Sequence, residues 1–442
     1  MLAWLAAGCL FSYTDSCDAQ LPSAFDSANR PNIIVILADD LGYSDIGCTG
    51  SEIETPNLDR LARDGILFTN CYNTSRCCPS RAALLTGQYQ WDAGLGHMIS
   101  TRSPYPEYQT SMNRDNITIP EALRPQGYQT VMSGKWHIGN ARRDWPDRRG
   151  FQSFYGTPTG GGLYFYPSRF YDRPIFRNGV EVTPDADWYS TDAFTDFAIE
   201  FLRNRKTSSP PFFMYLAYIA PHFPLQAKSK DISKYEGRYQ VGYESTRTAR
   251  FVRQQRMGIV PESTNPSGCV CPDWEKVDKK IEARKMAVYA AQIDCLDQNV
   301  GRIIETLKDT KSFQNTVVMF LSDNGGCSNS FNKTPAEEIG SRDSNAAYGV
   351  WYNVSNTPYR MAKSQEHEGG IITPLIVSWP KGLANPGTLN RTPVHIMDIL
   401  PTTLELSQTP IPHEIKGRKL DPIDGVSFAG ALRGEKLNED RT

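Results

Sequence analysis

Short apolar runs alternate with amphipathic stretches along most of the chain. The runs are rich in Ile, Val, Phe and Met, which is typical of strands buried on both faces. They predict strands at residues 32–38, 128–132, 212–218, 316–321 and 374–379. Helical spacing behind capping or proline signals predicts helices at residues 57–62, 192–203, 281–307 and 397–406. This alternation predicts an α/β sandwich around a large, mostly parallel sheet.

Two stretches between these elements are expected to be insertions that decorate the sheet. Residues 150–174 are rich in glycine and aromatic residues. Residues 228–278 are polar, basic in their first half and expected to be loop-like.

Composition sets only broad limits on function. The chain has 442 residues, of which 39% are hydrophobic and 22% are charged, as in ordinary globular enzymes. The formal net charge is −2, so bulk charge predicts neither a nucleic-acid partner nor binding to an anionic membrane. Any anion site must therefore come from a local cluster of cations.

The N-terminus predicts export. Residues 2–13 form an apolar run that is too short to span a bilayer, and small residues follow before Gln20. This pattern predicts a signal peptide over residues 1–19 and a periplasmic or secreted protein, although no Lys or Arg precedes the run. A lipoprotein site at Cys9 and a misassigned start are the alternatives. No later segment predicts a membrane span.

The cysteines do not form a disulfide scaffold. The chain has ten cysteines in 442 residues. Disulfide frameworks are typical of much shorter secreted domains, which cannot build a large hydrophobic core. Cys269 and Cys271 lie in a Pro/Gly-rich loop and could pair with other cysteines, but the sequence does not identify the partners.

Ionisable side chains follow four of the predicted strands. Because ligands bind at the carboxyl ends of strands in such sheets, these side chains are expected to meet at one edge. They are Asp39 and Asp40, Lys135 and His137, His222, and Asp323 and Asn324.

The acidic members of this set predict a metal site. Three carboxylates and one amide oxygen suit a hard cation, Ca²⁺ or Mg²⁺, better than zinc. The alternative is that Asp39-Asp40 and Asp323-Asn324 are ordinary turns that end strands. The shared position at strand ends favours the metal.

Cys77 begins a second candidate motif. Pro79 suits the first turn of a helix, and the residues after Arg81 are good helix formers. Cys77 is thus expected at a helix N-terminus, where a cysteine is normally a nucleophile of low pKa. A buried structural cysteine is the alternative.

Together these segments resemble the type I, formylglycine-dependent sulfatases, and in detail the bacterial arylsulfatases. The resemblance covers residues 31–441. Its motifs are Cys77-Cys78-Pro79-Ser80-Arg81 with Leu84-Leu85-Thr86-Gly87, Asp39-Asp40-Leu41-Gly42, Gly134-Lys135-Trp136-His137-Ile138-Gly139, Ala220-Pro221-His222, Ser322-Asp323-Asn324-Gly325-Gly326, and Lys363 before Glu368-Gly369-Gly370.

The resemblance implies an alkaline-phosphatase-like fold, a catalytic domain over residues 30–442 and a specific chemistry. A maturation enzyme would oxidise Cys77 to Cα-formylglycine, whose hydrate attacks the sulfur of a sulfate monoester. One Ca²⁺, or less plausibly Mg²⁺, would be bound by Asp39, Asp40, Asp323, Asn324 and the modified Cys77. Arg81, Lys135 and Lys363 would hold the sulfate and the formylglycine oxygens, His137 would act as a base, and His222 would lie near the leaving oxygen.

The resemblance is incomplete in two places. Many relatives carry an arginine after the Glu-Gly-Gly motif, whereas this chain continues with Ile371. The chain also ends at Thr442, where relatives usually begin a smaller C-terminal subdomain, so we expect that subdomain to be largely missing.

The expected substrate is an aryl sulfate or a sulfated carbohydrate. A phosphodiester or phosphonate monoester hydrolase of the same superfamily is the alternative enzyme. An inactive, sulfoglycan-binding relative is the alternative without catalysis.

Overall fold

The computed structural model describes residues 30–99, 103–168, 173–206, 208–330, 334–415 and 417–437. The predicted signal peptide and Cys9 lie outside these residues, and the domain bounds 30–442 stay a prediction. No helix in the described ranges combines the length and the hydrophobicity that a membrane span requires.

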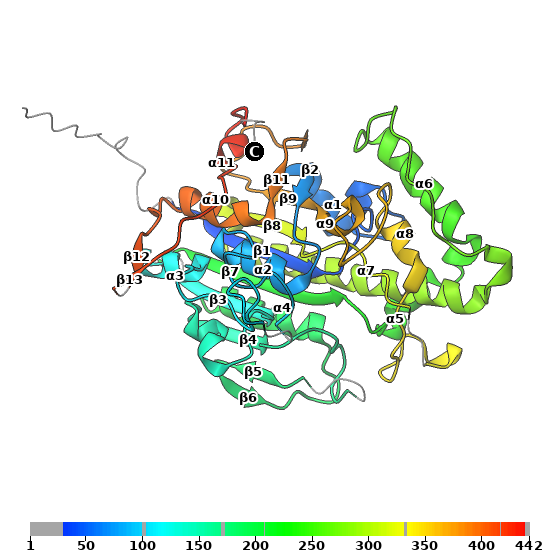
Figure 1. Ribbon diagram of the computed structural model, residues 1–442, viewed down its shortest axis with the longest axis horizontal. Coiled ribbons are helices and arrows are strands. Elements are labelled where there is room, and N and C mark those ends of the chain that lie inside the picture. Colours follow the sequence, from blue (N-terminus) through cyan, green and yellow to red (C-terminus); the bar gives the residue numbers. More distant parts are fainter. Residues whose placement is uncertain are drawn as a thin grey trace, which may run out of the picture.

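One mixed sheet of eleven strands forms the centre of the molecule (Figure 1). Its order is β10-β2-β9-β8-β1-β7-β3-β4-β5-β6, and β11 also pairs with β2. The strands are β1 (Asn32–Asp39), β2 (Ile66–Tyr72), β3 (Gln129–Lys135), β4 (Ser153–Thr157), β5 (Ile175–Arg177), β6 (Val180–Val182), β7 (Phe212–Pro221), β8 (Thr316–Ser322), β9 (Ile372–Ser378), β10 (Thr388–Asn390) and β11 (Val394–His395). A separate hairpin joins β12 (Glu414–Ile415) and β13 (Arg418–Lys419).

The central strands β8, β1, β7, β3 and β4 are parallel, as the sequence predicts. Ile34 of β1, for example, pairs with Met214 of β7 and with Val318 of β8. Strand β9 runs antiparallel to both of its neighbours. Lys363 precedes β9 in the chain and lies at the carboxyl ends of the parallel strands, beside Asp40. Because β9 starts from that edge of the sheet, it runs in the direction opposite to the parallel strands.

Helices cover both faces of the sheet, because the residues of β1 alternate between two hydrophobic cores. Ile34 and Ile36 belong to the core shared with α1, α4 and α7, and Ile33 and Val35 to the core shared with α2, α3 and α10. The helices are α1 (Pro56–Arg63), α2 (Cys77–Thr86), α3 (Ile119–Leu123), α4 (Ser190–Arg203), α5 (Ser229–Ile232), α6 (Tyr243–Arg256), α7 (Lys279–Asp309), α8 (Tyr352–Ser355), α9 (Glu368–Ile371), α10 (Ile399–Leu406) and α11 (Ala429–Leu432). The predicted sandwich of helices around a sheet is confirmed.

Both predicted insertions contain regular structure, so the expectation that the second is loop-like was wrong. Strand β4 lies in the first insertion and pairs with β3, and the missing Cβ of Gly156 lets its backbone lie close to that of Gly134. Helix α6 lies in the second. Its buried face includes Arg247 and Arg250 instead of an apolar stripe, and it therefore lacks the hydrophobic period of a surface helix. The two cysteines of this insertion, Cys269 and Cys271, are paired with each other.

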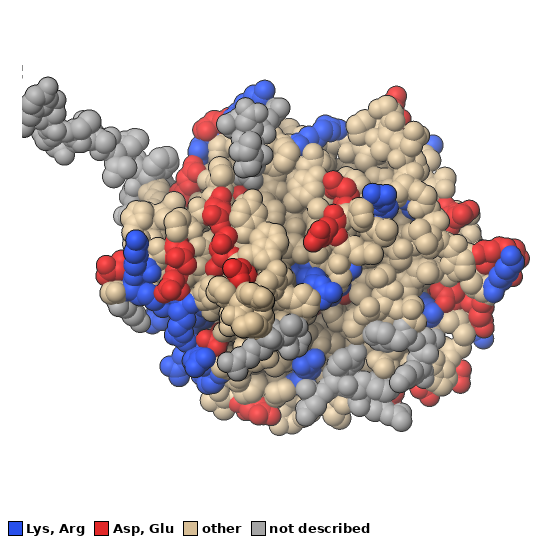
Figure 2. Space-filling model, viewed as in Figure 1, with Lys and Arg blue, Asp and Glu red and all other residues tan. Residues whose placement is uncertain are grey.

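The visible surface carries charges of both signs. Lys and Arg side chains are interspersed with Asp and Glu over the face in Figure 2, and the densest basic group lies at the lower left. This distribution agrees with the small net charge.

Candidate active site

The carboxyl end of β1 places two buried carboxylates side by side. Asp39 is the last residue of the strand, and Asp40 follows with a φ of 67°, in the left-handed region. The amide of Asp40 donates to Oδ1 of Asp323, 3.3 Å away, at the end of β8. The side-chain amide of Asn324 donates to Oδ1 of Asp40 at 2.7 Å. Two parallel neighbours thus bring four oxygen-bearing side chains together.

Cys77 is the first residue of α2, and Arg76 caps the helix in an extended conformation. The thiol donates to Oδ1 of Asp39 at 3.4 Å, and Nζ of Lys363 donates to its sulfur at 3.1 Å. All ten residues of α2 are buried, and Gly87 ends the helix in the left-handed conformation. The packed helix therefore holds the start of the motif against the acidic strand end.

Three cations neutralise the carboxylates. Nε and Nη2 of Arg81 lie 2.9 and 2.8 Å from Oδ2 of Asp323. Lys135, the last residue of β3, places Nζ 2.5 Å from Oδ2 of Asp39. Lys363 places Nζ 2.5 Å from Oδ1 of Asp40. Buried charges of this kind are tolerated because each is paired.

The two histidines approach this cluster from neighbouring strands. His137 lies two residues beyond β3, with a φ of 62° and an amide that donates to the carbonyl of Pro158. His222 follows β7, and its Nε2 lies 3.7 Å from Oδ2 of Asp40. Its Nδ1 lies 2.6 Å from the carbonyl oxygen of Phe223, and the two rings stack. This contact leaves Nε2 of His222 directed at the cluster.

The thiol of Cys77 does not have the low pKa expected of a cysteine at a helix N-terminus. Burial raises its pKa, and the negative charge of Asp39 raises it further, while Lys135 and Lys363 lower it only in part. Desolvation of the thiolate outweighs the helix dipole here. The expectation of a low-pKa cysteine nucleophile was wrong.

Burial and neighbouring charges also shift the pKa values of Asp39, His137, His222 and Lys363. Burial alone would raise the pKa of Asp39, but Lys135 and its other cationic neighbours bring it well below the usual value. Burial and then the charges of Lys135 and Arg81 lower the pKa of His137. Burial also lowers the pKa of His222. By contrast, Asp40 and Cys77 raise the pKa of Lys363 against the effect of burial. At neutral pH the two imidazoles are therefore neutral and Lys363 is charged.

The strand-end cluster has donor atoms close enough together to bind one metal ion. Asp39, Asp40, Cys77 and His222 each place one possible ligand atom within 4.8 Å of the others. Oδ2 of Asp40 and Oδ1 of Asn324 are buried and accept no hydrogen bond from the described residues. Such orphaned oxygens are costly unless a ligand satisfies them. Both carboxylate oxygens of Asp323 already accept hydrogen bonds, one from Arg81 and one from the amide of Asp40.

A second, buried network supports the Asp40 turn. The hydroxyl of Tyr289, on α7, lies 3.2 Å from the carbonyl of Asp40 and 2.7 Å from Oδ2 of Asp45. Oδ1 of Asp45 lies 2.6 Å from Nη1 of Arg250, whose Nη2 lies 2.8 Å from Oε1 of Glu52. This network was not predicted from the sequence, because the loop after β1, helix α6 and helix α7 lie far apart along the chain.

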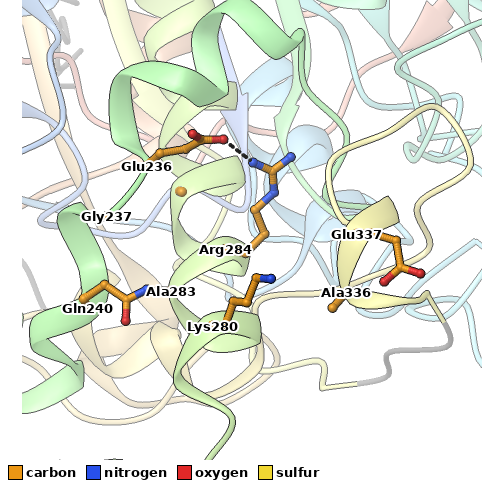
Figure 3. Close-up of a pocket in the computed structure, with 9 residues that line it drawn as sticks. Glu236, Gly237, Gln240, Lys280, Ala283, Arg284, Ala336 and Glu337 are labelled. Atoms are coloured by element: carbon orange, nitrogen blue, oxygen red, sulfur yellow. Dashed lines mark hydrogen bonds and ion pairs between the residues drawn. The ribbon is translucent and has the colours of Figure 1, made fainter.

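A cavity of about 390 Å³ lies apart from this cluster (Figure 3). Lys280 and Arg284 of α7 reach into it between Glu236 and Glu337, and Arg284 pairs with Glu236 at 3.0 Å. None of the predicted site residues lines it. The strand-end cluster is therefore the candidate active site.

Comparison with known proteins identifies the family. The sulfatase family model matches residues 31–409. The chain belongs to the sulfatase family. An uncharacterized sulfatase of Schizosaccharomyces pombe is 36% identical, over 88% of this chain and 77% of the relative. The arylsulfatase of Klebsiella aerogenes is 32% identical, over 90% of this chain and 91% of the relative.

A solved structure agrees with this assignment. Ps i-CgsB in complex with k-i-k-neocarrahexaose has a TM-score of 0.66 and 28% identity, over 92% of this chain and 77% of that one. The fold of this sulfatase is the alkaline-phosphatase-like sandwich that the sequence predicts. The enzyme is a sulfuric ester hydrolase, as its family membership shows.

Proposed function

We propose that residue 77 of this sulfatase, oxidised from cysteine to Cα-formylglycine, supplies the nucleophile for hydrolysis of a sulfate monoester. The observation that carries the proposal is the place of Cys77, between Oδ1 of Asp39 at 3.4 Å and Nζ of Lys363 at 3.1 Å. The raised pKa of the thiol argues against the unmodified cysteine as the nucleophile. The hydrate of formylglycine would supply a hydroxyl in its place.

We infer that Asp39, Asp40, Asn324 and Asp323 hold one Ca²⁺ together with residue 77. The orphaned oxygens of Asp40 and Asn324 support this ligand set, and all-oxygen donors favour Ca²⁺ or Mg²⁺. The cation would polarise a sulfate oxygen and offset the negative charge of the site. His222 lies close enough to compete as a ligand, so its contribution is a separate question for mutagenesis.

Arg81, Lys135 and Lys363 would bind the sulfate group. In the structure each of them pairs with a carboxylate of the proposed metal site. A cation bound to those carboxylates competes for the same oxygens, which leaves the three side chains able to bind the anionic sulfate. Fixed positive charge is required here because the sulfate oxygens repel an incoming nucleophile.

The pKa shifts divide the proton transfers between the remaining groups. His137 is neutral at pH 7, so it can accept a proton from a hydroxyl on residue 77. Lys363 holds its proton and contacts residue 77, so it can donate to the leaving oxygen. His222 is neutral as well, which favours Lys363 over His222 as the donor.

Two classes of sulfate ester are the candidate substrates. An aryl sulfate is supported by the similarity to an arylsulfatase, and a sulfated carbohydrate by the similarity to a structure that holds k-i-k-neocarrahexaose. The proposal also requires a maturation enzyme that oxidises Cys77. Export to the periplasm or medium is proposed from the pattern of residues 1–19 alone.

Mass spectrometry of the peptide that contains residue 77 tests the proposal. Loss of sulfur and gain of oxygen are expected in protein from a host with the maturation enzyme, and an unmodified thiol in active protein would contradict it. Rates with matched aryl sulfate and aryl phosphate esters then test the reaction. A large preference for the phosphate would favour a phosphoester hydrolase instead.

A further inference from the structure

The loop that follows β4 is hydrogen-bonded to the backbone of His137, which lies just beyond β3. The amide of Trp136 donates to the carbonyl of Thr157 at 3.0 Å, and the amide of His137 donates to that of Pro158 at 3.1 Å. The hydroxyls of Thr157 and Thr159 are 3.0 Å apart and stabilise the turn that follows. The backbones of the loop and of His137 are thus tied together just before Gly160.

Gly160 faces the imidazole of His137. A Cβ atom added at Gly160 would lie 3.0 Å from Nε2 of His137 and 3.2 Å from Cε1. Such distances are shorter than ordinary van der Waals contact. Gly160 does not have a positive φ, so alanine would fit its backbone conformation. The glycine at this position is therefore explained by the space beside the ring and not by backbone freedom.

The Nδ1 atom of the His137 ring is buried and has no hydrogen-bond partner among the described residues. The backbone of His137 is fixed by its bond to Pro158, so a methyl group on Gly160 would be relieved by rotation of the ring. Packing, and not hydrogen bonding, sets the orientation of this imidazole.

We propose that Gly160 is a positioning residue that acts through His137. The absence of a Cβ at residue 160 leaves the space that the ring and its Nε2 edge occupy in the observed orientation. This inference rests on the proposed function of His137 as the base. A base that is displaced by a fraction of an ångström loses much of its effect because proton transfer requires hydrogen-bond distance.

Gly160→Ala tests the inference. We expect kcat to fall about tenfold to a hundredfold, with a much smaller change in KM and in the unfolding temperature. A crystal structure of the variant should show the His137 ring rotated away from residue 160. Gly268→Ala is the matched control, because a Cβ there would meet nothing within 4 Å. Unchanged kcat, or an unmoved ring, would overturn the inference.

A double-mutant cycle separates positioning from a general structural role. If Gly160 acts through His137, Gly160→Ala should cause no further loss of kcat in the His137→Ala background. Equal losses in both backgrounds would contradict the inference, and so would full activity of His137→Ala alone. If the unaltered enzyme hydrolyses no sulfate ester, the proposed function fails. The crystal structure of Gly160→Ala still decides whether Gly160 sets the ring orientation.

Discussion

Nζ of Lys363 lies 3.1 Å from the sulfur of Cys77, although 286 positions separate the two residues in the sequence. The same ammonium group lies 2.5 Å from Oδ1 of Asp40. Lys363 therefore contacts both the proposed nucleophile position and the proposed metal site. Its raised pKa keeps it protonated, which suits a group that stabilises an anion.

Replacing Lys363 with alanine should reduce kcat about 10²- to 10⁴-fold, the range typical of a lost general acid. The variant keeps the pairs of Lys135 with Asp39 and of Arg81 with Asp323 but leaves Asp40 without its ammonium partner, so its unfolding temperature is measured beside the rate. Steady-state rates on an aryl sulfate measure the loss. Lys276→Ala is the control, since that side chain is 80% exposed. A Lys363→Ala enzyme with nearly normal kcat would remove Lys363 from the proton transfer.

Removal of divalent cations should lower both activity and thermal stability. A ligand that binds only the folded state stabilises it by about 2.7 kcal/mol at a hundred times its Kd. We therefore expect chelator to lower the unfolding temperature, and added Ca²⁺ to restore it more effectively than Mg²⁺. Asn324→Ala should weaken this response because it deletes an orphaned oxygen. An unfolding temperature that changes with neither chelator nor added cation would contradict the metal site.

The core of the fold was readable from the sequence because its strands are continuous apolar runs. β1, β7 and β8 are buried along nearly their whole length, and their ends carry the polar residues that mark the site. Strand β4 was missed because it has only five residues, and Ser153, Gly156 and Thr157 leave it without a continuous apolar run. Helix α6 was missed because buried arginines, such as Arg250, occupy its inner face and are neutralised only by residues far away in the sequence.

The residues of the site could be predicted from local motifs and strand ends. Properties that depend on tertiary packing could not. Asp39 and Lys135 meet because β1 and β3 end at the same edge of the sheet, with β7 between them, and the motif placed Cys77 at a helix start. The raised pKa of Cys77 could not be foreseen, since it arises from complete burial beside Asp39. The contact of Gly160 with His137 was equally hidden, because it requires the coordinates of two backbones.

The pH dependence of the reaction should reflect the lowered pKa of His137. The neutral imidazole is the base, and it persists until the pH falls below that pKa. An ordinary histidine titrates near pH 6.5, so the acid limb of kcat should lie below about pH 6.5. A bound cation adds positive charge and moves the limb further in the same direction. Rates measured between pH 4 and pH 8 check this, and an acid limb above about pH 6.5 would contradict the assignment of His137 as the base.

Because of Glu52, the free energy of unfolding of the enzyme should fall as the pH becomes acidic. Burial would raise its pKa, but Arg250 more than compensates and lowers it from 4.5 to about 2. Burial raises the pKa of Asp45, the other acid on Arg250, so Glu52 is the partner that keeps its charge as the pH falls. A carboxyl of lowered pKa contributes stability that is complete above its unfolded value and is lost as the pH falls toward its folded value. The contribution, about 3 kcal/mol at neutral pH, should therefore disappear between about pH 4.5 and pH 2.

Glu52→Gln tests this linkage. At pH 7 the variant should unfold with about 3 kcal/mol less free energy than the unaltered enzyme, and the difference should shrink steadily as the pH falls below about 4.5. Denaturant titrations at several pH values measure both quantities. Glu54→Gln is the matched control, because Glu54 is 58% exposed and its pairing with Arg238 is a surface ion pair worth about 0–1 kcal/mol. A difference between Glu52→Gln and the unaltered enzyme that does not change with pH would show that Glu52 stabilises the Asp45–Arg250 network by shape and hydrogen bonding, and not by its charge.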